Sequence, residues 1–378
     1  MARKKDATAE IEVVEEADQS RAHRVLAGAA LAAITKKHGS SVLFLASDEH
    51  YQTVPRIPTN ILKLDWALGG GWPAGRINLI YGHKSASKTS TLLRTIGNAQ
   101  KMCANCFKVP DSPKCCGKFR EMVCAFIDVE GALDHAWAQK LGVDLERLIY
   151  CRPEFAEQAL DICEALVQSG DVDVVVLDSL AYLTPSKEIE ESIEKETMGV
   201  QARMIGKAMR KLNAALSAMK NERGQLVTIF FTNQIRMKVG LVFGSPETVP
   251  GGLSPGFAAT TEVKVWPGKY DIDEETGCPR SVEMNFRVEK NKSYRPKMEG
   301  AFRMMLSDME HKKEGQIYDE DAAVKLCEQF KLAEGHGNSW TCLGEKFGGK
   351  RLIEERLLTD PEFRAKVYGS LMQVLLAV

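Results

Sequence analysis

The sequence of 378 residues lacks any apolar run long enough to span a bilayer. It also lacks a secretory signal, because Met1–Gln19 is charged throughout and carries no apolar core. Neither sign of charge dominates, since 50 basic residues stand against 51 acidic ones, a net charge of −1. These absences argue against a membrane protein and an exported one. Any contact with nucleic acid must come from local basic patches.

Without an export route, the expected location is the cytoplasm. The ten cysteines are then expected to be reduced thiols or metal ligands. A content of 44% hydrophobic and 27% charged residues is typical of a soluble globular protein. The chain is longer than one ordinary core requires, so we expect one large α/β domain with smaller appendages.

The segment Arg76–Thr91 (RINLIYGHKSASKTST) has the layout of a phosphate-binding loop. The apolar residues Ile77, Leu79 and Ile80 indicate a short buried strand, Gly82 a turn, and Lys88 the start of a helix. In such a loop backbone N–H groups wrap the phosphates, a lysine neutralises them and a hydroxyl ligates Mg²⁺. The residues assigned to the loop are Gly82, His83, Lys84, Ser85, Ala86, Ser87, Lys88, Thr89 and Ser90.

The usual pattern, G-x-x-x-x-G-K-[ST], has a second glycine where this chain has Ser87. A side chain there restricts backbone angles that glycine adopts freely, so nucleotide affinity or turnover is expected to be unusual. Similar strings also occur by chance in loops. The position between a strand and a helix, together with the residues downstream, favours the nucleotide site.

Three polar residues follow further expected strands. The hydrophobic strand Val172–Asp178 ends in an acid, and Asp178 would hold the Mg²⁺ shell through water. Glu130 closes another strand, where its carboxylate could orient or deprotonate a water that attacks the γ-phosphate. Gln234 follows the strand Leu226–Thr232 and could donate to that phosphate.

Each of these three residues also has a simpler interpretation. Asp178 could cap the next turn, Glu130 could belong to a salt bridge, and Gln234 could be a solvated glutamine at a strand end. Apolar strands that alternate with helices favour a parallel sheet covered on both faces.

Residues 103–118 form a cysteine-rich interruption before the strand that carries Glu130. The pattern C-A-N-C-x8-C-C contributes Cys103, Cys106, Cys115 and Cys116. Four thiolates suit a tetrahedral Zn²⁺ site, and the metal would stabilise the fold of a short insertion that has no hydrophobic core. Because Cys115 and Cys116 are adjacent, one could be a bystander and Cys124 the fourth ligand. Incidental thiols in a loop are the other interpretation. The basic side chains around it favour contact with DNA.

Several segments together resemble the RecA family of homologous-recombination ATPases. They are FIDVEGALD (126–134), VDVVVLDSLAYLTP (172–185), MGVQARMIGKAMRKL (198–212), NQIRMKVGLVFGSPETVPGG (233–252) and VEKNK (288–292). They occur in the family's order, and the likeness covers about residues 21–306. The resemblance implies an α/β fold: a RecA-like P-loop NTPase core, with a mostly parallel sheet flanked by helices, an N-terminal helix and a small α/β C-terminal domain.

The domain organisation implied by the resemblance has four parts. Residues 1–20 are expected to be a disordered tail, and residues 21–56 an N-terminal polymerisation helix and strand. The helix, Arg21–His38, is ended by Gly39 and in the family packs on the next subunit. Residues 57–306 would form the ATPase core with insertion 103–118, and residues 307–378, rich in short polar helices, the C-terminal domain.

For the nucleotide, the resemblance implies ATP with Mg²⁺. Lys88 and Thr89 would serve the phosphates and the Mg²⁺ ion. Glu130 would activate the attacking water, and Asp178 would belong to the metal shell.

Further residues match positions around the nucleotide in the family. Asp134 and Trp137 match positions that hold the adenine. Gln234 matches the residue that links the γ-phosphate to the following DNA-binding loop. Lys290 and Lys292 match lysines that reach the ATP of the adjacent protomer.

For DNA, the resemblance implies two loops, at about Glu188–Gly199 and Lys238–Ala259. The residues placed nearest the strand are Met198, Gly199, Arg203, Gly206, Arg210, Arg236, Met237, Lys238, Val249, Pro250, Gly251, Gly252 and Leu253. Arg203 and Arg210 share one face of an expected helix and can meet successive phosphates. Simpler interpretations are a solvated helix face for the arginines and core filling for the methionines.

The chain departs from the family pattern outside Ser87 as well. Lys84 replaces the usual acid, and Leu306 stands where an aromatic ring commonly stacks on adenine. The chain stops at an apolar LMQVLLAV, so the acidic tail of many bacterial members is missing. Basic residues of the C-terminal domain suggest capture of duplex DNA: Lys346, Lys350 and Arg351.

The function implied is that of an ATP-dependent recombinase. It would form helical homo-oligomeric filaments on single-stranded DNA, pair them with homologous double-stranded DNA, and hydrolyse ATP in response to DNA. Two other classes stay open: a ring-forming helicase motor with the same core, and an ATP-gated DNA-binding scaffold with weak hydrolysis, which Ser87 makes plausible.

Overall fold

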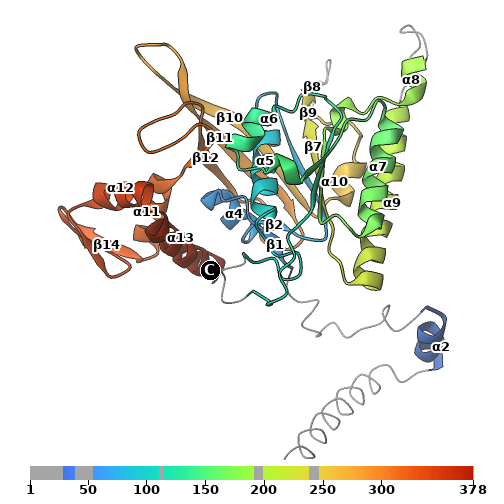
Figure 1. The fold of residues 1–378 in the computed structure, drawn as a ribbon, viewed down its shortest axis with the longest axis horizontal. Coiled ribbons are helices and arrows are strands. Elements are labelled where there is room, and N and C mark those ends of the chain that lie inside the picture. The colour runs from blue at the N-terminus through green and yellow to red at the C-terminus, as the bar shows by residue number, and fades with distance from the viewer. Residues whose placement is uncertain (1–28, 39–53, 110–114, 191–198, 238–246, 378) are drawn as a thin grey trace, which may run out of the picture. The chain divides into compact units, whose positions relative to one another are not determined.

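The computed structural model describes residues 29–38, 54–109, 115–190, 199–237 and 247–377 (Figure 1). The chain divides into two compact units, Met1–Val54 and Pro55–Val378. In the first unit the described element is helix α2, Ala29–His38, which ends one residue before Gly39 as expected. The expected tail, the beginning of this helix and the strand after it lie outside the described residues.

The second unit is built on a nine-stranded sheet in the order β13-β12-β11-β10-β3-β7-β6-β4-β5. Strands β10, β3, β7, β6, β4 and β5 pair in parallel, whereas β11, β12 and β13 extend the sheet in antiparallel fashion. Their bounds are β3 Ile77–Gly82, β4 Cys124–Asp128, β5 Leu148–Cys151, β6 Val174–Asp178, β7 Thr228–Gln234, β10 Thr261–Ile272, β11 Pro279–Asn291, β12 Glu299–Met305 and β13 Ile317–Tyr318. The mostly parallel sheet predicted from the sequence is confirmed.

Helices cover both faces of this sheet and close two hydrophobic cores (Figure 1). Consecutive residues of one strand enter opposite cores: Phe230 of β7 packs in one and Phe231 in the other. The first core is covered by α4 (Leu62–Leu68), α5 (Lys88–Ala99) and α6 (His135–Lys140), and the second by α7 (Ala156–Ser169) and α9 (Val200–Arg223). Among the described helices, none is long and apolar enough to cross a membrane.

Short elements complete the part of the fold that carries the site. They are β1 (Arg56–Ile57), β2 (Trp72–Pro73), α8 (Ser186–Glu190), β8 (Arg236–Met237), β9 (Glu247–Thr248) and α10 (Ser254–Ala258), with single 3₁₀ turns at Leu145–Arg147 and Leu180–Tyr182. Strands β8 and β9 pair antiparallel and form a two-stranded ribbon beyond the carboxyl end of β7.

The residues after β13 build a third core of their own. This C-terminal part comprises α11 (Glu320–Gln329), β14 (Ala333–His336), β15 (Ser339–Cys342), β16 (Glu345–Phe347), α12 (Lys350–Thr359) and α13 (Pro361–Ala377). Its three short strands form an antiparallel sheet, as the α/β character implied by the resemblance requires. The individual strands could not be placed from the sequence, because each holds at most four residues. Leu62 of α4 packs into this core and connects it to the large sheet.

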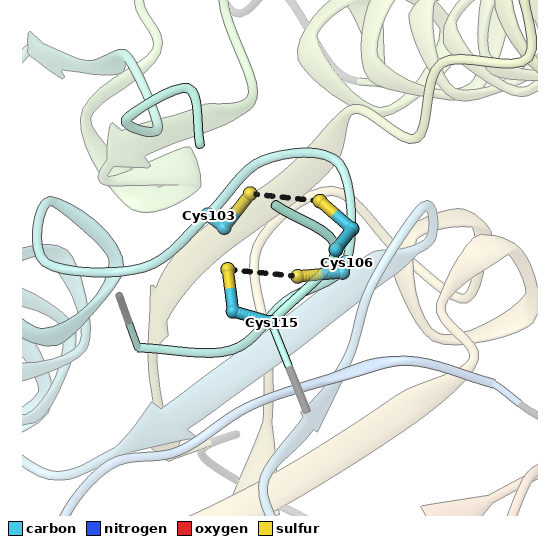
Figure 2. A group of neighbouring side chains, drawn as sticks. Cys103, Cys106 and Cys115 are labelled. Atoms are coloured by element: carbon cyan, nitrogen blue, oxygen red, sulfur yellow. Dashed lines mark hydrogen bonds between the residues drawn. The ribbon is translucent and has the colours of Figure 1, made fainter. Parts of the chain in front are cut away.

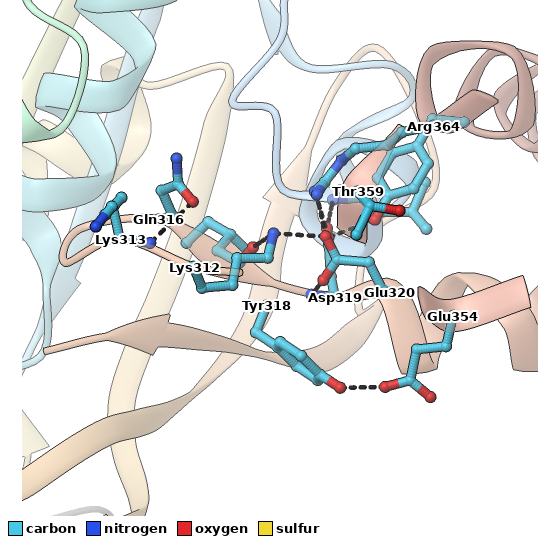
Figure 3. Close-up of polar contacts among 12 residues, drawn as sticks. Lys312, Lys313, Gln316, Tyr318, Asp319, Glu320, Glu354, Thr359 and Arg364 are labelled. Carbon is cyan, nitrogen blue, oxygen red and sulfur yellow. Dashed lines mark hydrogen bonds and ion pairs between the residues drawn. The ribbon is translucent and has the colours of Figure 1, made fainter. Parts of the chain in front are cut away.

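A buried cluster of charges lies at the junction between the large sheet and the C-terminal part (Figure 3). The Lys312 ammonium pairs with Glu320 at 2.5 Å and donates to the carbonyl of Ile317 at 2.8 Å. Arg364 pairs with Asp319 at 3.0 Å and also with Glu320. The charged groups therefore neutralise one another within the cluster, which we call the junction cluster.

Candidate nucleotide-binding site

The phosphate loop connects the carboxyl end of β3 to the amino end of α5. Gly82 closes β3 against β10, where an added Cβ would lie 2.0 Å from the Val265 carbonyl oxygen, so only glycine fits. Ser85 and Ser87 both adopt left-handed backbone angles, with φ of 56° and 49°. Left-handed angles are unfavourable for residues with a Cβ. The strain expected from Ser87 in place of glycine is thus present in the structure.

Lys88 begins α5 and turns its ammonium back into the loop. Its Nζ donates to the carbonyl of His83 at 2.7 Å and to that of Gly82 at 3.4 Å. Burial lowers the pKa of Lys88, although Asp178 and Glu130 oppose this by favouring the charged form. Among the described residues, no carboxylate forms an ion pair with this ammonium. It is a buried cation available to an incoming phosphate.

Thr89 and Asp178 meet although they come from different elements. The Thr89 hydroxyl donates to Asp178 Oδ2 at 2.5 Å, and Thr232 of β7 donates to the other carboxylate oxygen. Burial raises the pKa of Asp178, and these two hydrogen bonds and Lys88 act in the opposite direction. A hydroxyl and a carboxylate are the ligand types that Mg²⁺ prefers, so the donor set fits that ion.

A cavity of about 230 Å³ opens beside these groups. Its lining includes the expected nucleotide residues Thr89, Ser90, Glu130, Asp134, Trp137 and Asp178. The Trp137 indole donates to the Ser90 hydroxyl at 3.0 Å, and Asp134 caps α6 by accepting from the Trp137 backbone N–H at 3.0 Å. The cavity therefore joins the phosphate loop to the end of β4 and the start of α6.

Glu130 lies two residues beyond β4 rather than at its end. Burial and the nearby Asp178 raise the pKa of Glu130, while a hydrogen bond from Tyr182 and the charge of Lys88 oppose the shift. Glu130 is thus a carboxylate with a raised pKa that lines the cavity near Lys88, a combination that occurs at general bases.

Asp128 is a residue of this site that sequence reasoning missed. It is buried at the end of β4, and its carboxylate accepts from the backbone N–H groups of Gly131 and Leu133 at 2.7 and 3.0 Å. The Tyr150 hydroxyl donates to it at 3.0 Å. Asp128 therefore fixes the turn that carries Glu130. In the sequence, Asp128 is the first acid of the string FIDVE, and its place at the end of an apolar run could have identified it.

Gln234 is the last residue of β7 and lies opposite Gly82 in the strand register. The next residue, Ile235, donates its backbone N–H to the Gly82 carbonyl at 3.1 Å. Asn233, which the sequence reasoning did not select, donates its side-chain amide to the Pro250 carbonyl at 2.9 Å. The end of β7 thus contacts both the phosphate loop and the glycine-rich segment.

Lys290 and Lys292 lie at the end of β11 and do not line the cavity among its described residues. The Lys290 ammonium donates to the carbonyl of Gly256 and lies 3.7 Å from Glu262. Lys292 donates its backbone N–H to Thr260. That these lysines reach the nucleotide of an adjacent protomer stays a prediction.

The expected DNA residues fall into a buried and an exposed group. Arg203, Arg210 and Arg236 are exposed, and Met237 is 59% exposed, so core filling is not its role. Gly206 instead faces α10, where an added Cβ would lie 3.0 Å from the Ser254 hydroxyl oxygen. Met198 and Lys238 lie outside the described residues.

The segment from Val249 to Leu253 turns on two left-handed glycines. Gly251 and Gly252 have φ of 85° and 67°. Pro250 is buried, whereas Leu253 is 76% exposed. Phe257, one turn later on α10, is 73% exposed and was not predicted. Gly199 likewise has a left-handed angle, φ 79°, at the amino end of α9.

The four cysteines of the insertion gather at one point (Figure 2). The Sγ atoms of Cys103, Cys106, Cys115 and Cys116 all lie within 4.8 Å of one another. Cys124 is buried in β4 and belongs to the first core, so it is not the fourth member. The residues that follow the two cysteine pairs, Phe107 and Gly117, have φ of 58° and 72°.

Backbone donors also surround this cysteine cluster. Burial would raise the pKa of Cys103, but backbone N–H groups of Arg120, Asn105 and Cys106 donate towards its sulfur and lower the pKa to about 6. The cluster is held to the sheet by Arg120, which forms a bidentate pair with the buried Asp173 at 2.7 and 3.0 Å. Because α5 separates the cluster from the phosphate loop, it lies at the end of that helix away from the nucleotide site.

Comparison with known proteins gives consistent matches over most of the chain. Residues 25–112 and 115–309 match the family described as RecA N-terminal domain. The chain is 37% identical over 374 residues to Protein RecA of Mannheimia haemolytica, covering 96% of this chain and 90% of that protein. It is 36% identical over 353 residues to Protein RecA of Francisella philomiragia subsp. philomiragia, covering 92% and 88%. The interruption of the family match falls inside the cysteine-rich insertion.

Proposed function

The chain belongs to the RecA family, and from this premise we propose a mechanism for an ATP-dependent recombinase that hydrolyses ATP in response to DNA. The observation that supports the mechanism most is the cavity beside Lys88. Its lining includes two hydroxyls, four acids and an indole: Thr89, Ser90, Asp128, Glu130, Asp134, Asp178 and Trp137. These are the groups needed to hold a triphosphate, a magnesium ion and an adenine ring.

Each group has a distinct part in this mechanism. The Lys88 ammonium, now on two carbonyl oxygens, moves to the phosphates. Thr89 and Asp178 would hold the Mg²⁺ ion, Asp178 through water, and the ion would supply charge neutralisation to the phosphates. Glu130 accepts a proton from the attacking water, and Asp128 keeps its turn in place.

We propose that the protein assembles as helical filaments on single-stranded DNA and pairs that strand with homologous duplex. The exposed Arg203, Arg210 and Arg236 would contact phosphates, and Met237 would lie against bases. Lys290 and Lys292 would complete the nucleotide site of the adjacent protomer. A cytoplasmic location stays a prediction.

A strand-exchange assay with and without ATP tests this function directly. We expect pairing only with ATP and Mg²⁺, and we expect Glu130→Gln to keep ATP-dependent binding of single-stranded DNA while losing hydrolysis. Absence of ATP-dependent DNA binding by the wild type would contradict the proposal. Electron microscopy with a non-hydrolysable analogue distinguishes open helical filaments from the closed rings of a helicase. Filaments with negligible phosphate release would favour the scaffold.

We also propose a structural Zn²⁺ ion in the cysteine cluster. Four thiols within 4.8 Å, with left-handed residues after each pair and backbone N–H groups directed at sulfur, match the needs of a tetrathiolate site. Metal analysis should find one zinc per chain, lost in Cys106→Ser and retained in the control Cys278→Ser, whose thiol is exposed elsewhere. Equal zinc content in both variants would contradict this assignment.

Duplex capture by the C-terminal part is a further hypothesis. Lys350 pairs with Glu328 at 2.5 Å and Arg351 with Glu355 at 2.8 Å, so these two cations already have acidic neighbours. Lys346 is exposed on β16. Crosslinking of the protein to duplex DNA, followed by mapping of the linked residues, tests the hypothesis. Crosslinks confined to the large sheet would exclude it.

A further inference from the structure

We propose that His83 is a positioning residue that ties the phosphate loop to the second strand of the β8–β9 ribbon. The proposal rests on the nucleotide site described above but concerns a contact outside it. The ribbon has two arms, β8 (Arg236–Met237) and β9 (Glu247–Thr248), which pair with each other. The first arm contacts Gly82 and the second contacts His83, the next residue of the loop.

The first arm is joined through the main chain. Ile235, directly before β8, donates its N–H to the Gly82 carbonyl at 3.1 Å. Gln234 lies opposite Gly82 in the pairing of β3 with β7. A displacement of Gly82 is therefore passed to β8 through a backbone hydrogen bond.

The second arm is joined through side chains. His83 Nε2 lies 3.6 Å from Glu247 Oε1 of β9, and the other carboxylate oxygen pairs with Lys264 of β10 at 2.5 Å. A cavity of about 420 Å³ lies beside this trio and is also lined by Trp266, Pro267, Arg287 and Glu289. The His83 side chain is 47% exposed and that of Glu247 34%, so the contact can break without opening a core.

The nucleotide reaches both arms because of where Lys88 is held. Its ammonium donates to the His83 carbonyl at 2.7 Å and to the Gly82 carbonyl at 3.4 Å. A bound phosphate competes for the same ammonium, so nucleotide binding releases both carbonyls at once. Gly82 and His83, which contact the ribbon, therefore each lose a hydrogen bond from Lys88 when nucleotide binds.

Both strands of the ribbon are therefore connected to nucleotide binding, β8 through Gly82 and β9 through His83. If Gln234 and Ile235 were the only connections, a movement of the phosphate loop would reach β8 directly. It would reach β9 only through the pairing of β9 with β8. With His83, the acid at the start of β9 also lies 3.6 Å from a side chain of the loop, within ion-pair distance of a protonated imidazole. A ligand shifts an equilibrium only through contacts that differ between its states, and the His83–Glu247 contact supplies such a difference at the second arm.

Hydrogen exchange in the absence of DNA tests the contact directly. Wild-type protein with and without a non-hydrolysable ATP analogue and Mg²⁺ should show altered exchange in peptides covering both arms. His83→Ala should keep the change at Arg236–Met237 and lose most of it at Glu247–Thr248. His83→Lys, which supplies a cation at the same position, should restore it. Lys264→Met is the matched control, because Lys264 also pairs with Glu247 but does not belong to the loop.

A second readout uses DNA. The ratio of single-strand affinities with and without saturating analogue should fall about tenfold in His83→Ala, a change within the range of measured couplings between two sites. Lys264→Met should leave that ratio close to the wild-type value. The exchange experiment stands whether or not DNA binds.

The outcomes separate this proposal from the proposed function. If the analogue binds and the β9 response in His83→Ala equals that of the wild type, the His83 connection is wrong while the nucleotide site stands. If Lys264→Met loses the response as fully as His83→Ala, Glu247 acts through β10, and His83 has no special part. If the analogue does not bind the wild type, both proposals fall.

Discussion

Two buried groups of charge in this protein are organised in opposite ways. In the junction cluster, Lys312 and Arg364 meet Glu320 and Asp319 directly. At the nucleotide site, Lys88 is buried to a similar degree, with 8% exposure against 6% for Lys312, but within the described part of the chain it donates only to carbonyl oxygens. One group is complete without a ligand, whereas the other leaves a cation for a substrate to neutralise.

The comparison shows what distinguishes a binding site from a structural ion cluster. Both types of group carry perturbed pKa values, because burial lowers the pKa of Lys312 as well as that of Lys88. A perturbed pKa is therefore insufficient to identify a site. The observation that distinguishes them is the partner of the buried charge. In a structural cluster an acidic side chain of the protein neutralises it, whereas in a binding site the ligand does. Three substitutions test buried charges, and a fourth tests the backbone of the phosphate loop.

The largest effect is expected from Glu320→Gln in the junction cluster. It leaves the buried Lys312 and the partly exposed Arg364 with Asp319 as the remaining acid. Removal of one partner from a buried charge group costs about 3–5 kcal/mol. Urea unfolding measures the loss. The control Glu328→Gln breaks an exposed pair with Lys350 and should cost less than about 1 kcal/mol. Equal losses in the two variants would show that the cluster does not stabilise the fold.

Lys88→Ala should have the opposite profile. It removes a buried cation that has no acidic partner among the described residues, so stability without nucleotide should be nearly unchanged. Nucleotide affinity should fall by roughly tenfold to a hundredfold, the size of a lost hydrogen bond to a charged group. Isothermal titration with an ATP analogue measures it, and Lys313→Ala, on an exposed pair, is the control. A large stability loss with unchanged affinity would reverse the assignment of the two groups.

Asp65→Asn tests a third buried charge, which lies near the junction cluster. Burial raises the pKa of Asp65 from 3.8 to about 7, against the hydrogen bonds donated by Thr59. The folded state therefore holds a proton that the unfolded state has released, so Asp65 destabilises the fold increasingly from about pH 4 to pH 7 and fully above it.

The asparagine carbonyl can still accept from Thr59, so Asp65→Asn should raise the thermal unfolding temperature at pH 8 and change it little at pH 4.5. The expected gain at pH 8 is about 1–3 kcal/mol. Asp161→Asn, at an exposed position of α7, should show no such pH dependence. A gain for Asp65→Asn that is equal at both pH values would contradict the raised pKa.

The smallest effect is expected from Ser87→Gly in the phosphate loop. Glycine relieves the left-handed angle at φ 49°, which costs a residue with a Cβ about 1 kcal/mol. Stability without nucleotide should rise, as thermal unfolding would show. Ser217→Gly within α9 should lower stability, because glycine is unfavourable inside a helix. A loss in both variants would mean that Ser87 is not strained.

The sequence predicted through its strands that the candidate nucleotide residues lie close together. Asp178 and Gln234 are the last residues of β6 and β7, and the carboxyl ends of parallel strands meet at one edge of a sheet. An apolar strand that ends abruptly in a polar residue therefore indicates that this residue lies at the carboxyl edge of the sheet. The cysteine pattern was informative for a similar reason, because four thiols in one short segment must come close.

Other features could not be predicted because they depend on distant contacts. His83 and Glu247 belong to separate segments with no local pattern that joins them. The C-terminal strands are too short to show alternation, and glycines lie between them. Glu320 looks like an ordinary acid at the start of a helix, and only the fold shows that it is wholly buried.

The cysteine cluster follows the end of α5 that lies away from the phosphate loop. A helix of 12 residues spans about 18 Å at 1.5 Å per residue, so this connection tolerates added material without crowding the reacting groups. It is also a suitable place to graft a fluorophore or an affinity tag for following single filaments.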